Sequence, residues 1–139
     1  MKTLEQWFAE YSESHQNPVN RRIHKICVPL IFFSVIGFLL QIPWGLGPIR
    51  SGELVIAAAL GWYLTLGIKP FFIMLAQVFV SYILLYILGH FGHTLGILIT
   101  IFVVAWAGQF YGHKVEGKKP SFFKDLQFLL IGPLWIWKH

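Results

Sequence analysis

The order of apolar and polar positions divides the chain into long apolar runs joined by short polar segments. Four apolar runs cover residues 26–42, 53–68, 71–88 and 93–111. Runs of about 17–20 residues match the ~30 Å hydrocarbon core of a bilayer, so the pattern predicts four transmembrane helices. Lys69-Pro70 is expected to separate the second helix from the third, and the segment from Gly89 to Gly92 to form a tight turn after the third.

Two shorter segments flank the predicted spans. Residues 1–16 begin with a capping box, Thr3-Leu4-Glu5-Gln6, and carry apolar residues at helical spacing, which predicts a short amphipathic helix on the membrane surface. The helix is expected to break at Asn17-Pro18, because proline disfavours helix in the residue before it. Residues 126–137 are too short for a typical span and contain Gly132-Pro133. They predict a re-entrant or interfacial helix, or a short fifth span.

Composition supports a membrane protein. Of the 139 residues, 56% are hydrophobic and 12% charged, against roughly 25% charged in soluble domains. We therefore expect an all-α integral membrane protein with a single membrane domain, residues 1–139. Cys27 is the only cysteine, which excludes an internal disulfide and a cysteine-based zinc site. The sequence leaves the oligomeric state open, and both a bacterial inner membrane and the endoplasmic reticulum fit as locations.

Charge placement predicts the topology. With the amino terminus inside, nine basic residues fall on the inner side and only Arg50 falls in an outer loop, with Lys138 depending on whether residues 126–137 cross. The net charge of +5 is therefore explained by the positive-inside rule and does not indicate nucleic-acid binding. This arrangement predicts that His15, His24 and His113 lie on the cytoplasmic face and that His90 and His93 lie on the opposite one.

Two polar segments, residues 15–24 and 109–120, stand at the edges of the first and fourth predicted spans. Each contains histidine with amide or carboxylate neighbours. Asn20 and His24 share a helix face at i, i+4, as do Gln109 and His113. The candidate ligands are His15, His24 and His113, and the candidate supporting residues are Asn17, Asn20, Gln109 and Glu116.

Neutral imidazoles with oxygen donors suit iron, zinc, copper or nickel, and amide or carboxylate partners would orient the rings. The alternative is that these polar residues only anchor helix ends at the interface. His90 and His93 could form a second ligand pair, although the glycines around them favour a simple outer turn. Arg21, Lys118 and Lys119 either follow the positive-inside rule alone or also attract a carboxylate or phosphate headgroup.

The two segments resemble a known family. Tyr11-x-x-x-His15-x-Asn17-Pro18-x-Asn20-x-x-x-His24 and Gln109-Phe110-x-Gly112-His113-x-x-Glu116 are similar to motifs of the membrane 2-hydroxy fatty acid dioxygenases of long-chain-base α-oxidation. The resemblance covers nearly the whole chain. Eukaryotic members place the glutamate four residues after the last histidine, whereas Glu116 follows His113 by three, which leaves its role open.

The resemblance implies an enzyme that uses Fe²⁺ and O₂ to shorten a long-chain 2-hydroxy fatty acid by one carbon. It also implies that His15, His24 and His113 are linked to the iron and to catalysis. Three protein ligands would leave about three positions on the iron, enough for a chelating hydroxyl and carboxylate and for O₂. No 2-oxoglutarate is needed, because the substrate can supply the electrons. The alternative function is a non-catalytic lipid- or metal-binding membrane protein that uses the same histidines.

Overall fold

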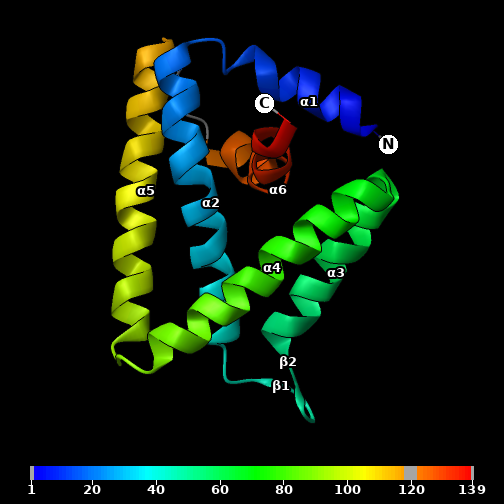
Figure 1. Ribbon diagram of the computed structural model, residues 1–139, viewed down its shortest axis with the longest axis vertical. Coiled ribbons are helices and arrows are strands. Elements are labelled where there is room, and N and C mark those ends of the chain that lie inside the picture. The colour runs from blue at the N-terminus through cyan, green and yellow to red at the C-terminus, as the bar shows by residue number, and fades with distance from the viewer. Residues whose placement is uncertain (1, 118–121, 139) are drawn as a thin grey trace. The chain divides into compact units, whose positions relative to one another are not determined.

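The structure is a computed structural model that describes the backbone of residues 2–117 and 122–138 and the side chains of residues 2–117 and 128–137. Helices dominate it, which confirms the all-α class (Figure 1). The helices are α1 (Leu4–Glu13), α2 (Pro18–Leu40), α3 (Ser51–Leu66), α4 (Ile68–Gly89), α5 (Thr94–Glu116) and α6 (Phe122–Lys138). Two short antiparallel strands, β1 (Gly45–Leu46) and β2 (Ile49–Arg50), form a hairpin between α2 and α3.

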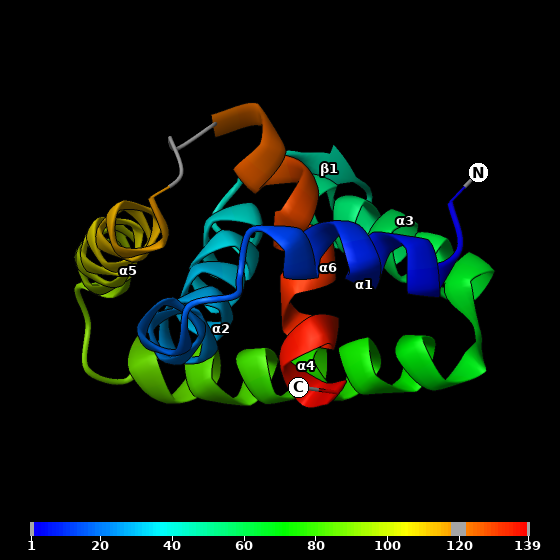
Figure 2. The ribbon, with the colours of Figure 1, turned by 90° about the horizontal axis from the view of Figure 1, so that it is seen from above.

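The chain divides into two compact units. The first unit comprises residues 1–32 and 102–139, and therefore contains α1, α6, the start of α2 and the end of α5. Within it α1 packs on α6, and the blue start of α2 lies beside the orange-yellow end of α5 (Figures 1 and 2). The candidate ligands His15, His24 and His113 all belong to this unit.

The second unit, residues 33–101, contains the hairpin and packs α3 against α4. Its buried side chains include Tyr63, Met74 and Val78. A close contact joins α2 to α5 within this unit, because a Cβ added to Gly37 would lie 2.6 Å from a methyl carbon of Leu98.

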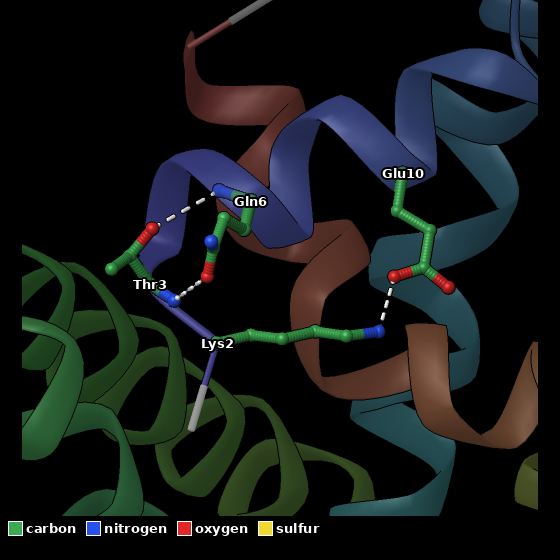
Figure 3. A network of polar contacts seen from close by, with 4 residues as sticks. All are labelled: Lys2, Thr3, Gln6 and Glu10. Atoms are coloured by element: carbon green, nitrogen blue, oxygen red, sulfur yellow. Dashed lines mark hydrogen bonds and ion pairs between the residues drawn. The ribbon is translucent and has the colours of Figure 1, made fainter.

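The first helix has the predicted capping box. The backbone N–H of Gln6 donates to Thr3 Oγ1 (3.3 Å) and the backbone N–H of Thr3 donates to Gln6 Oε1 (2.8 Å), and Lys2 forms an ion pair with Glu10 (Figure 3). These bonds satisfy two N–H groups that the start of a helix otherwise leaves without partners. The helix buries Phe8 and Tyr11.

The predicted boundary at Lys69-Pro70 is wrong. The break lies at Gly67, whose φ of 140° suits glycine, and both Lys69 and Pro70 fall in the first turn of α4. Proline is tolerated there because the first N–H groups of a helix have no partner within it. The turn after α4 was correctly predicted, since α4 ends at Gly89 and α5 begins at Thr94.

By length and composition, three helices in the described part of the chain could cross a membrane: α2, α4 and α5. The apolar helix α3 has 16 residues, and the apolar stretch Phe128–Trp137 of α6 is also short. Helix α6 continues through Pro133 over 17 residues, so its helical part is longer than the predicted 126–137. The structure thus supports a membrane protein, whereas the fourth span and a re-entrant α6 stay predictions.

Candidate active site

The break between α1 and α2 places His15 outside any helix. Helix α1 ends at Glu13, and Asn17 starts α2 because its side-chain oxygen accepts from the backbone N–H of Val19 (2.9 Å). Pro18 occupies the first helical position, where a missing N–H has no cost. The break was predicted from Asn17-Pro18, and it turns the chain so that His15 and His24 meet despite their spacing of nine residues.

Three histidines from three segments gather in the first unit. His15 precedes α2, His24 lies in its second turn, and His113 lies in the last turn of α5; all three are at most 5% exposed. Their ring centroids are 4.3 Å apart for His15 and His24, 5.5 Å for His24 and His113, and 6.4 Å for His15 and His113. Three buried imidazoles from two regions far apart in the sequence therefore lie close together in the first unit.

Two of the rings have a defined tautomer. His15 Nδ1 lies 2.7 Å from the carbonyl oxygen of Tyr11, and His24 Nδ1 lies 3.0 Å from that of Asn20. A carbonyl oxygen can only accept, so Nδ1 carries the hydrogen in both rings and Nε2 carries the lone pair. This is the arrangement in which a protein orients an imidazole as a metal ligand or as a base.

A group of polar contacts, here called the Glu116 clamp, fixes the segment that carries His15. Glu116 Oε1 accepts from the backbone N–H of Asn17 (2.8 Å) and from Asn20 Nδ2 (3.1 Å), which also donates to the carbonyl of Ser14 (3.2 Å). Arg21 Nε donates to the carbonyl of His15 (2.6 Å). The clamp therefore joins the end of α5 to the α1–α2 break and to the helix turn that holds His24.

Aromatic side chains from α1 and α6 enclose one side of the histidines. The Tyr11 ring stacks on that of His15, with centroids 4.0 Å apart and planes 3° from parallel. Phe128 and Trp135 of α6 pack against Tyr11, and Trp135 Nε1 donates to Ser12 Oγ (2.8 Å). A cavity of about 10 Å³ lies among Tyr11, His15, His24, Val28, Trp106, Gln109, Phe128 and Leu129. It has room for about one water molecule.

Helices α2 and α5 can approach closely because glycines face the contact. A Cβ added to Gly108 would lie 2.6 Å from Cys27 Sγ, and one added to Gly112 would lie 2.3 Å from Asn20 Oδ1. Gly108 and Gly112 form a G-x-x-x-G pair, a pattern that brings membrane helices together. This signal was present in the sequence and was missed in the sequence-based prediction.

The three histidines are of a residue type that binds metals through the imidazole ring. A metal–nitrogen bond of about 2.1 Å puts the ring centre about 3.2 Å from the ion, so two imidazoles on one ion have centres about 4.5 Å (right angle) to about 6.4 Å (opposite) apart. The three observed separations lie close to this range. Among the described residues, however, no group of three His, Cys, Asp or Glu side chains has an arrangement that could hold a metal ion. For a metal to bind, the rings would have to turn so that their nitrogen atoms point to one place, with little change in the positions of the ring centres.

The other predicted residues have varied positions. Gln109 lines the cavity, and Arg21 lies against Trp135, with its guanidinium carbon 5.6 Å from the ring centroid. Lys118 and Lys119 lie outside the described residues. His90 and His93 belong to the second unit, where both are exposed and the His90 ring packs on Tyr86. Sequence reasoning missed the wall residues Trp106, Phe128 and Trp135, whose apolar character gave no sign that they would meet at one place.

Comparison with known protein families shows a match over the whole chain. The family model described as "2-hydroxy-palmitic acid dioxygenase Mpo1-like" matches residues 1–139, the whole chain. No curated protein and no solved structure matches the chain significantly.

Proposed function

The chain belongs to the Mpo1-like family, and from this premise we propose that it is an iron-dependent dioxygenase that acts on a long-chain 2-hydroxy fatty acid. The reaction would convert R–CH(OH)–COOH and O₂ to R–COOH, CO₂ and H₂O. The bond between the first and second carbons breaks, and the second carbon becomes the new carboxyl group. These two carbons lose four electrons in total, which is the number that O₂ takes up, so 2-oxoglutarate is not required.

One observation carries the proposal: three buried imidazoles face one another at the start of α2 and the end of α5. In this proposal His15, His24 and His113 hold Fe²⁺. The iron would supply open positions at which O₂ and the hydroxyl and carboxylate oxygens of the substrate bind together. The protein's own contribution is to present Nε2 of His15 and of His24 by fixing Nδ1–H on backbone carbonyls.

Basic residues near the histidines support binding of an acidic headgroup. Arg21 is half-buried beside His15, and Lys114 is exposed one residue after His113. A positive charge close to the cavity attracts a carboxylate. Lys118 and Lys119 extend the same positive run in the sequence. The hydrocarbon tail would leave the site toward the bilayer, with α2, α3, α4 and α5 as the spanning helices and the histidines on the cytoplasmic side.

Two observations favour a second candidate, a lipid- or metal-binding membrane protein without catalysis. The cavity holds only about one water molecule, and the described residues do not form a complete metal-ligand group. A fatty acid could therefore enter only if α6 or its side chains moved. Substrate turnover separates the two candidates, because a binding protein would take up the acid unchanged.

The test uses detergent-purified protein loaded with Fe²⁺ without O₂ and then exposed to 2-hydroxy-palmitic acid and O₂. We expect one iron per chain by elemental analysis and the acid one carbon shorter by mass spectrometry, with oxygen from labelled O₂ in its carboxylate. Replacing His15, His24 or His113 by alanine should abolish turnover and lower the iron content at least tenfold.

His90→Ala and His93→Ala are the matched controls, and both should leave iron content and turnover unchanged. Full iron loading without turnover of 2-hydroxy-palmitic acid would exclude the enzyme and favour the binding protein. Loss of iron in the His90 variant would show that the ligand assignment is wrong.

A further inference from the structure

Gln109 is a polar side chain in a place where packing alone would favour an apolar one. It lies on the buried face of α5, one turn before His113, and is 7% exposed. The side chain lines the cavity together with His15, His24 and Trp106. Its Oε1 is buried and has no hydrogen-bond partner among the described residues.

A buried oxygen without a donor destabilises a fold, and a methionine of similar size would avoid that cost. One reason for a protein to keep such a group beside a cavity is that a ligand or an ordered water completes the hydrogen bond. The cavity beside Gln109 has a volume of about 10 Å³, which is room for about one oxygen-sized group. The site is therefore built to receive one small donor, either a water molecule or a hydroxyl of a ligand.

The chemistry of the acceptor identifies the donor. An amide oxygen accepts hydrogen bonds and does not donate them. An ionised carboxylate also only accepts, so it cannot pair with Gln109 Oε1. In a 2-hydroxy fatty acid the only O–H or N–H group at neutral pH is the 2-hydroxyl.

We propose that Gln109 is the residue that distinguishes a 2-hydroxy acid from a plain fatty acid, by accepting a hydrogen bond from the 2-hydroxyl. The inference rests on the proposed function for its choice of ligand. The bond would place the hydroxyl beside His24 and His15, since both line the same cavity. A site that hydrogen-bonds a hydroxyl rejects the analogue without it, because the acceptor then stays buried and unsatisfied.

The experiment measures binding rather than turnover. Iron-loaded protein is kept free of O₂ in one detergent, and the dissociation constants of radiolabelled 2-hydroxy-palmitic acid and palmitic acid are measured. The wild-type protein should prefer the 2-hydroxy acid. In Gln109→Met this preference should fall by roughly tenfold or more, with little change in the binding of palmitic acid.

Two further measurements separate recognition from a structural role. The matched control is Gln77→Met in α4, because Gln77 Oε1 is also buried and without a partner among the described residues, but lies in the second unit. It should leave the preference unchanged. Gln109→Met should also melt at the same temperature as the wild type or higher, since it removes an unsatisfied oxygen, whereas loss of a structural hydrogen bond would lower the melting temperature.

Retention of the preference in Gln109→Met would overturn the inference even if turnover proves the proposed function. A wild-type protein that binds both acids equally would overturn it as well. If no turnover occurs, but the wild type prefers the 2-hydroxy acid and Gln109→Met does not, the inference stands and the proposed enzyme fails.

Discussion

Replacing Gly112 with alanine is expected to push α2 away from α5 at the level of the histidines. The new Cβ would lie 2.3 Å from Asn20 Oδ1 and 3.3 Å from His24 Cε1. Non-bonded carbon atoms prefer separations of about 3.5–4.0 Å, and a carbon and an oxygen slightly less, so the contact with Asn20 Oδ1 must open by about 1 Å. Asn20 cannot simply rotate, because its Nδ2 donates to both Glu116 and the carbonyl of Ser14.

The magnitude follows from these contacts. Overpacking of a tight contact costs about 1–3 kcal/mol, and weakening the two bonds of Asn20 adds about 0.5–1.5 kcal/mol each. The higher helix propensity of alanine offsets about 1 kcal/mol. We therefore expect a net loss of about 1–5 kcal/mol in the free energy of unfolding. Because Asn20 and His24 move together, the affinity of the proposed site for iron should also fall by about 10–100-fold.

Two other glycines of α5 serve as comparisons. Gly96→Ala should leave the stability and the iron affinity unchanged or raise stability slightly. Among the described residues, no atom outside its own stretch of helix lies within 4 Å of its added Cβ. Gly108→Ala should destabilise, because its Cβ would lie 2.6 Å from Cys27 Sγ. Cys27→Ala removes the sulfur atom in this contact, so the double variant should regain most of the stability. Cys27→Ala should not restore the stability of Gly112→Ala.

Thermal unfolding in detergent and elemental analysis of iron measure these effects. If Gly112→Ala and Gly96→Ala have equal melting temperatures and equal iron contents, α2 and α5 do not approach each other closely near His24. Failure of Cys27→Ala to rescue Gly108→Ala would place the clash elsewhere.

Two further predictions concern the clamp and the topology. Glu116→Ala should destabilise by about 2–3 kcal/mol, because the N–H of Asn17 and the amide of Asn20 lose their acceptor, whereas Glu116→Gln keeps an acceptor oxygen and should lose about 1 kcal/mol. Equal melting temperatures for the two variants would show that the clamp contributes nothing. With the native cysteine replaced, single cysteines at the exposed positions Glu13 and Lys114 should react with an impermeant reagent from the same side of the membrane. Labelling from opposite sides would contradict the proposed topology.

Local signals predicted the parts of the site that neighbouring residues determine. Thr3 and Gln6 predicted the start of α1, and Asn17-Pro18 predicted the break that places His15 near His24. The boundary predicted from Lys69-Pro70 was wrong, because proline is also favoured in the first turn of a helix, and Gly67 was the stronger signal.

Contacts between distant parts of the chain could not be read from the sequence. Glu116 is 99 residues from Asn17, and its bond to the backbone there depends on how α2 and α5 pack. Trp135 donates a hydrogen bond to Ser12, 123 residues away in the sequence. The apolar run that contains Trp135 did not indicate that it would pack against α1. Periodicity shows which face of a helix is buried, but it does not show which other face covers it.

The position of His15 explains why the site needs the clamp. His24 and His113 lie on helices, whose backbone bonds fix them, whereas His15 lies in the break between α1 and α2. The backbone of His15 is held instead by two bonds of its own: its N–H donates to the carbonyl of Ser12, and its carbonyl accepts from Arg21. The neighbouring backbone is held by the bond from Asn20 to the carbonyl of Ser14 and by the bond from the N–H of Asn17 to Glu116. A segment held by a few bonds can shift more easily than a helix. His15 is therefore the ring with most freedom to move its donor atom toward a metal, and the clamp limits how far it moves.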